Sequence, residues 1–154
     1  MRAMLELFID ADACPVRDEA FRVAERHGLR VHAVTCGNVR VPRHPDFRTV
    51  LVEAGADAAD DWIAGHIGEG DICVTNDIPL AARCLEAGAE ALGASGRRFT
   101  SRNIGEALAG RELSAHLREL GAERSGPRPL SARDRSQFLS VLDTIVQEIR
   151  RRTP

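Results

Sequence analysis

Two short apolar runs of the chain each end in aspartates. The run that ends at Ile9 is followed by Asp10 and Asp12, and the run that ends at Val74 leads to Asp77. If both runs are neighbouring strands, which lie about 4.8 Å apart, Asp10 and Asp77 reach one cation between them. Carboxylates this close repel one another unless a cation or a proton intervenes, and hard oxygen ligands select Mg²⁺ or Mn²⁺. The spacing therefore predicts a divalent metal site.

Helix capping is the competing interpretation of these aspartates. Asp12 and Asp77 both precede a helix-opening proline, Pro15 and Pro79, and aspartate is a preferred N-cap. For either residue alone, capping is the simpler explanation. A cap needs only one acid, however, and here three acids lie at adjoining strand ends, which favours the metal site.

A third group of acids opens the helix that follows the third expected strand. Asp57, Asp60 and Asp61 lie at i, i+3 and i+4, so one of them can point at the same ion. The first turn of a helix is enriched in acids in any case. The sequence does not decide which of the three faces the site.

The elements that must position these residues follow an alternating pattern. Short apolar runs predict strands at 5–9, 31–36, 48–52, 71–75 and 89–92, and amphipathic segments predict helices at 15–28, 57–67 and 79–88. The alternation predicts an α/β fold with a mostly parallel sheet and helices on both faces. Only the strand order 3-2-1-4-5 places the aspartate-bearing ends together, at the edge where such sheets bind ligands.

The remainder of the chain has a different pattern. From about residue 96 we expect only loops and helices, with a break at 125–129. The last helix opens on a capping box formed by Ser131 and Asp134, carries apolar residues at 3.6-residue spacing and ends in arginines at 150–152. We therefore expect one domain over residues 1–154, with a sheet core at 5–95 and a helical extension at 96–154.

The composition removes several mechanisms. The chain has no lysine and no tyrosine, which excludes a Schiff base, a phosphate-loop lysine and a tyrosine acid or base. Residues 1–96 carry 16 acids and 9 arginines, whereas residues 97–154 carry 7 acids and 12 arginines. This asymmetry suits an acidic site facing a basic, phosphate-binding flank, and it equally suits two halves that neutralise each other on folding.

The cysteines and the early sequence indicate the compartment. The 4 cysteines form no C-x-x-C pair, and no early apolar stretch is long enough for a signal peptide or a membrane span. We therefore expect reduced thiols, a cytoplasmic location and no membrane partner.

Arginines in predicted loops or first turns are candidates for phosphate binding. A solvated surface position is the alternative for each. Arg97 and Arg98 follow the fifth strand, so we expect single-stranded nucleic acid along that edge. None of the 5 histidines is assigned a function. The candidate arginines are Arg40, Arg97, Arg98, Arg133 and Arg135.

Four motifs together resemble the YaiI/YqxD family, which is PIN-like. They are D-A-D-A-C-P at 10–15, G-x-D-x-A-D-x-x-I at 55–63, D-I-C-V-T-N-D-I-P-L-A at 71–81 and S-A-R-D-R at 131–135. The resemblance covers about residues 5–150. One departure is Ser125, where the family pattern leads us to expect glycine.

The resemblance implies a single PIN-like domain with an acidic Mg²⁺ site and nuclease chemistry. In that pattern Asp10, Asp60 and Asp77 fall on the acidic positions, with Asp12 and Asp57 close by.

The leading hypothesis is thus a Mg²⁺- or Mn²⁺-dependent nuclease that acts on RNA in preference to DNA. A non-catalytic nucleic-acid- or partner-binding module is the first alternative. A phosphatase of the haloacid dehalogenase type is less favoured, because Cys14 follows the D-x-D motif and lysine is absent. The sequence leaves the number of metals and the oligomeric state open. In the nuclease hypothesis Asp10 and Asp77 are direct ligands, Asp12 and Asp60 are ligands or hold water, and Thr75 and Asn76 orient them.

Overall fold

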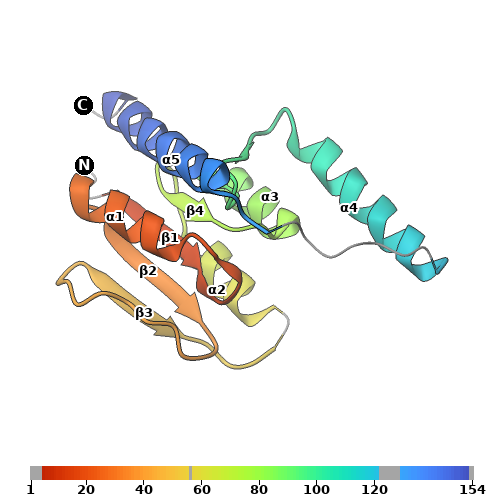
Figure 1. Ribbon diagram of the computed structural model, residues 1–154, viewed down its shortest axis with the longest axis horizontal. Helices are drawn as coiled ribbons and strands as arrows, with labels where there is room; N and C mark the ends of the chain where they lie inside the picture. The colour runs from red at the N-terminus through yellow and green to blue at the C-terminus, as the bar shows by residue number, and fades with distance from the viewer. Residues whose placement is uncertain (1–4, 56, 122–128, 153–154) are drawn as a thin grey trace.

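The computed structural model describes residues 5–55, 57–121 and 129–152, and Ser125 lies outside them. The described residues form a six-stranded sheet of order β3-β2-β1-β4-β5-β6, together with five α-helices (Figure 1). The strands are β1 Glu6–Asp10, β2 Arg30–Thr35, β3 Phe47–Leu51, β4 Ile72–Val74, β5 Glu90–Leu92 and β6 Arg98–Phe99. The helices are α1 Arg17–His27, α2 Ala58–His66, α3 Ile78–Glu86, α4 Ile104–Glu119 and α5 Ala132–Arg152, with a 3₁₀ turn η1 at Ala11–Ala13.

The central strands are parallel, and the predicted order 3-2-1-4-5 is confirmed. β1 pairs with β2 on one side and with β4 on the other, both in parallel. Leu7, Phe8 and Ile9 of β1 are at most 1% exposed, as expected of a strand covered on both faces. The carboxyl ends of β1 and β4 are therefore neighbours, and the aspartates that follow them share one edge of the sheet.

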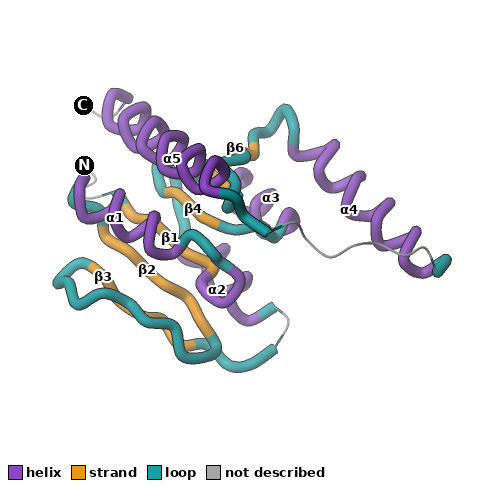
Figure 2. Tube along the Cα trace, viewed as in Figure 1, coloured by secondary structure: helices purple, strands orange, loops and turns teal. Residues whose placement is uncertain are grey.

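Helices cover both faces of the sheet, as predicted. α1 and α5 lie together on one face, with α2 and α3 on the other (Figure 2). Because side chains alternate along a strand, Leu7 and Ile9 pack with the α1 and α5 residues while Phe8 packs under α2 and α3. The apolar stripe predicted for the last helix is buried at Phe138, Leu142, Ile145, Val146 and Ile149.

The predicted start of the last helix is confirmed. The Asp134 amide donates to Ser131 Oγ at 3.0 Å, and the Ser131 amide donates to Asp134 Oδ2 at 3.0 Å. This reciprocal pair satisfies two backbone donors at the start of α5.

The prediction that only loops and helices follow residue 96 is wrong at one place. β6 pairs antiparallel with β5, with Leu92 opposite Arg98. A two-residue strand is too short to show a period in the sequence, which is why it was missed. The turn before it depends on Gly96, which has φ of 88° and where a Cβ would lie 2.9 Å from Gln137 Cγ. The hairpin is thus seated directly against α5.

α4 extends away from the body of the molecule (Figure 1). It packs on α3, whereas Leu113, Leu117 and Leu120 near its end are exposed. None of the helices in the described part of the chain combines the length and the apolar composition needed to cross a bilayer. The four cysteines are free thiols.

Candidate functional site

The carboxyl ends of β1 and β4 are joined by a side chain between them. Thr75 is 3% exposed, and its hydroxyl donates to Asp10 Oδ2 at 3.0 Å. The amide of Asp77 in turn donates to the same hydroxyl oxygen at 3.0 Å. Thr75 therefore orients Asp10 and fixes the backbone of Asp77.

Asp77 is the N-cap of α3, so the capping interpretation is correct as far as it goes. Its Oδ1 accepts a hydrogen bond of 2.9 Å from the Leu80 amide, with Pro79 in the first turn. A cap uses one carboxylate oxygen, and no described residue donates to Oδ2. Capping and ion binding are therefore compatible at this residue.

Asp60 is the acid of α2 that faces the other two carboxylates. Burial and, to a smaller extent, the negative charges of Asp77, Asp10 and Asp57 together raise the pKa of Asp60 to about 6. Its neighbour Asp61 is turned to the surface, where it accepts a hydrogen bond of 2.9 Å from Arg83. The structure thus distinguishes Asp60 from Asp61, which spacing alone could not do.

Asp10 is in the same electrostatic environment. Burial raises its pKa, the hydrogen bond from Thr75 lowers it, and the charges of Asp77 and Asp12 raise it again. Asp10, Asp60 and Asp77 are referred to below as the acidic triad, and the charge of Asp77 opposes the ionisation of the other two. This is the electrostatic condition that a bound cation relieves.

Asp12 is held in place by hydrogen bonds from the end of β2 and the residue that follows it. Thr35 donates a short hydrogen bond to its Oδ1, and the Cys36 amide donates to Oδ2 at 2.9 Å. These bonds, with a smaller contribution from Arg17, lower the pKa of Asp12. Both oxygens of Asp12 are therefore engaged in fixing the loop after β2.

Two contributors to this arrangement were not anticipated from the sequence. Thr35 ends the strand beside β1 just as Thr75 follows β4, so a threonine at each flanking strand end was the available signal. Arg17 donates from its guanidinium to the Ala11 carbonyl at 2.9 Å and thereby holds η1 in place.

Asn76 positions the β5–β6 turn. Its Oδ1 accepts a hydrogen bond of 2.8 Å from the Ala94 amide. A Cβ at Gly93 would lie 3.0 Å from the same oxygen, so a larger residue there would crowd the Asn76 side chain. Asn76 therefore connects the end of β4 to the hairpin that carries Arg97.

The candidate arginines divide into two groups. Arg98 donates to Glu90 at 2.9 Å and to Glu148 at 3.1 Å, so its guanidinium joins β5 to α5. Arg135 donates to the Pro15 carbonyl at 2.9 Å and to Glu19 at 3.0 Å, which joins α5 to α1. These two side chains bind protein partners. The other three, Arg40, Arg97 and Arg133, are exposed.

The acidic triad offers oxygen ligands for Mg²⁺ but does not by itself complete the coordination shell of an ion. Within the described residues no group of three or more His, Cys, Asp or Glu side chains is placed to hold a metal ion. Mg²⁺, however, is typically held by one or two carboxylates together with waters and substrate phosphates. Hard oxygens with raised pKa values at Asp10 and Asp60 fit a hydrated ion of this kind.

Comparison with known proteins gives one family. The family model described as "Uncharacterized BCR, YaiI/YqxD family" matches residues 8–148. A UPF0178 protein of Rhodospirillum rubrum is 57% identical over 148 residues, which cover 96% of this chain and 99% of the relative. A UPF0178 protein of Parvibaculum lavamentivorans is 56% identical, over 98% of this chain and 99% of its own length. A UPF0178 protein of a Caulobacter species is 52% identical, over 96% and 98% respectively. No solved structure shows a significant match to the chain.

Proposed function

The chain belongs to the YaiI/YqxD family, and from that membership together with the acidic triad we propose that it is a Mg²⁺- or Mn²⁺-dependent nuclease. Its substrate is single-stranded nucleic acid, RNA in preference to DNA. The observation that carries the proposal is the pKa of Asp60, raised to about 6 by burial and by Asp77 and Asp10 at the ends of two adjoining strands. Strongly perturbed titratable groups at the carboxyl edge of a parallel sheet are characteristic of functional sites.

The side chains of the triad have distinct roles in this proposal. Asp10, oriented by the Thr75 hydroxyl at 3.0 Å, presents its Oδ1 as a ligand. Asp77 presents Oδ2 while its Oδ1 accepts from the Leu80 amide. Asp60 is a ligand or holds the attacking water. When bound, the divalent cation supplies an activated water and stabilises charge on the leaving oxygen.

The surrounding residues fix the loops beside the triad and offer a contact for the substrate. Asp12 contributes indirectly, because its hydrogen bond from the Cys36 amide fixes the loop beside the site. Asn76 holds the β5–β6 turn through the Ala94 amide, and with it the exposed Arg97. A guanidinium there is suited to a substrate phosphate. The free thiols suit a reducing compartment, so we place the enzyme in the cytoplasm.

A binding module without catalysis is the second candidate. It is favoured by the lack, within the described residues, of a group of three or more side chains placed to hold a metal. Such a module would use the same edge of the sheet to bind nucleic acid without hydrolysing it.

The decisive experiment is a cleavage assay on end-labelled single-stranded RNA and DNA. The wild type is assayed with Mg²⁺, with Mn²⁺ and with EDTA beside Asp60→Asn and Asp61→Asn. These two positions are adjacent on α2, but Asp61 is paired with Arg83 at the surface. We expect metal-dependent cleavage that falls at least about 100-fold in Asp60→Asn and persists in Asp61→Asn. Equal cleavage by both variants would contradict the proposal, and binding without cleavage by the wild type would favour the second candidate.

A further inference from the structure

A series of aromatic rings extends from β1 and β2 in the core to the outer end of α2. His66 stacks on Trp62 with ring centroids 3.9 Å apart and an interplanar angle of 16°. Trp62 lies 5.8 Å from His32, which stacks on the buried Phe8 at 4.6 Å. Phe8 is buried, Trp62 is half-buried and His66 is exposed. The outer ring is therefore open to solvent while the inner rings are fixed in the core.

Hydrogen bonds fix the orientation of both imidazoles. His66 Nδ1 donates to the Trp62 carbonyl at 2.7 Å, because a carbonyl can only accept. His32 accepts at Nδ1 from Arg48 Nε at 3.0 Å and donates from Nε2 to Glu6 at 2.7 Å. A ligand that stacks on the exposed His66 ring meets a surface that is already ordered, so little conformational entropy is lost on binding.

Arg48 adds a fixed positive charge to this surface. Its guanidinium carbon lies 5.8 Å from the Trp62 ring centroid, and its Nε is used by His32. Its terminal nitrogens donate to no described residue. The segment 30–50 contains four arginines, at 30, 40, 43 and 48, and Asp46 is its one acid. Residues 1–96 as a whole carry more acids than arginines, whereas this segment is basic, so positive charge is concentrated beside Trp62.

The aromatic surface and the acidic triad share one helix. Asp60 is in the first turn of α2 and His66 is its last residue. Six residues of helix span about 9 Å along the axis. At 3.6 residues per turn, the same six residues also place His66 about 120° around the helix from Asp60. A strand whose phosphate lies at the triad therefore has to curve around α2 to place one of its bases on His66.

From this arrangement we propose that His66, Trp62 and Arg48 form a stacking platform for single-stranded RNA. A base stacks on the open face of His66, supported from beneath by Trp62, and Arg48 contacts an adjacent phosphate. Stacking on aromatic rings is tolerant of sequence, so the platform positions a strand without selecting its bases. The inference rests on the proposed function for the nature of the ligand, but it concerns binding and is separable from cleavage.

The chain contains a built-in probe for this test. Trp62 is the single tryptophan of the sequence and tyrosine is absent, so intrinsic fluorescence reports on the platform alone. A 12-nucleotide adenosine RNA is titrated into the protein in EDTA at low salt, where cleavage is prevented. Binding is followed in parallel by anisotropy of a labelled RNA. We expect Trp62 emission to be quenched over the same concentration range in which anisotropy rises.

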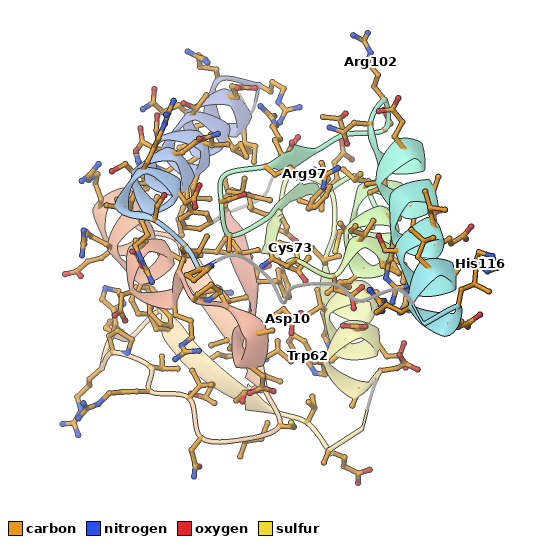
Figure 3. The ribbon with its side chains drawn as sticks, turned by 45° about the vertical axis from the view of Figure 1, so that its right-hand side comes forward. Asp10, Trp62, Cys73, Arg97, Arg102 and His116 are labelled. Atoms are coloured by element: carbon orange, nitrogen blue, oxygen red, sulfur yellow. The ribbon has the colours of Figure 1, made fainter. Side chains whose placement is uncertain are left out.

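The variants are His66→Ala and Arg48→Gln, with His116→Ala and Arg102→Ala as controls. All four positions are exposed, and Figure 3 shows both control side chains on the α4 side of the molecule, away from Trp62. We expect His66→Ala to weaken binding about fivefold or more. Arg48→Gln should reduce the slope of log K against log salt by about 0.7, the value for one contact to a single strand. Circular dichroism melting confirms that each variant is folded.

The outcomes separate the two proposals. If RNA binds with no change in Trp62 emission, or if both platform variants bind like the wild type, the platform is wrong even where metal-dependent cleavage is observed. If the wild type binds, is quenched and depends on both residues but never cleaves, the platform stands and the nuclease proposal fails. If the wild type binds no RNA in EDTA, the platform fails, and the cleavage assay with metal decides the nuclease proposal separately. A DNA 12-mer that binds as tightly as RNA would overturn the preference for RNA.

Discussion

The hydroxyl of Thr75 donates to Asp10 Oδ2 at 3.0 Å, so the residue that follows β4 orients the carboxylate that ends β1. The hydroxyl oxygen of Thr75 also accepts a hydrogen bond from the Asp77 amide, so Thr75 links two members of the acidic triad.

Replacing Thr75 by valine tests this link. Valine keeps the shape but removes both hydrogen bonds, so we expect a loss of about 1–2 kcal/mol in the free energy of unfolding. The pKa of Asp10, which the Thr75 bond lowers, should rise further. Urea unfolding and an NMR titration of the Asp10 carboxyl measure the two effects. Thr75→Ser retains the hydroxyl and is the control, and an Asp10 titration that is unchanged in the valine variant would contradict the role of Thr75.

Substitutions at Asp77 separate capping from ion binding. Without metal, Asp77→Asn should be as stable as the wild type or more stable, because asparagine caps Leu80 equally well and one repelling charge is lost. Asp77→Ala should cost about 0.5–2 kcal/mol. Thermal unfolding with and without millimolar Mg²⁺ or Mn²⁺ should show a gain in the wild type that is reduced in Asp77→Asn and in Asp10→Asn. The metal site would be excluded if the metal did not stabilise the wild type, or if it stabilised both Asn variants as much as the wild type.

The raised pKa of Asp60 gives a pH dependence of defined sign. The folded pKa is about 6 against 3.8 for the unfolded chain, so the folded state binds more protons in that range. The contribution of Asp60 to stability is therefore favourable at low pH and is lost as the pH rises from about 4 to about 6. Asp60→Asn should raise the stability of the metal-free protein at pH 7 by about 1 kcal/mol, allowing for solvent at this half-buried position. Chemical unfolding measured from pH 4 to 8 tests this, with Asp61→Asn expected to keep the wild-type profile.

Arg97 and Arg98 are adjacent in the chain but should behave differently. Arg98→Ala should destabilise the protein by about 1 kcal/mol or more, because Glu148 loses Arg98 and Glu90 keeps only its longer contact of 3.4 Å with Arg152. Arg97→Ala should leave stability unchanged and weaken nucleic-acid binding, with a salt dependence reduced by about one contact. Melting temperatures and RNA titrations of the two variants decide this. If both variants lost RNA binding to a similar extent while their stability was unchanged, Arg97 and Arg98 would both bind nucleic acid, as the sequence predicts.

The sequence predicted the layout of the sheet because that layout follows from periodicity. The carboxyl-end position of Asp10 and Asp77 follows from the parallel order of β1 and β4, which alternating apolar runs already imply. What could not be predicted depends on side-chain partners that are distant in the chain. Arg98 was expected at a phosphate, but its partner Glu148 lies 50 residues away on α5. Asp12 and its donor Thr35 are 23 residues apart.

The histidines illustrate the same limit. His66 has no motif around it in the sequence, and its interest lies entirely in the ring on which it stacks, Trp62. His32 becomes informative only because the register of β2 and β3 sets it opposite Arg48. Such contacts are consequences of the fold and carry no local signal.

The position of α5 has a consequence for how the protein is made. Its buried residues, from Phe138 to Ile149, complete the core under α1 and β1, although α1 is synthesised more than 100 residues earlier. Arg135 of α5 and Glu19 of α1, which are 116 residues apart in the chain, form a hydrogen bond of 3.0 Å. A nascent chain emerging from the ribosome therefore leaves exposed the part of this apolar face that α5 covers until residue 149 has been added. Contacts this remote in sequence slow folding, so the partly made chain is the species most in need of a chaperone.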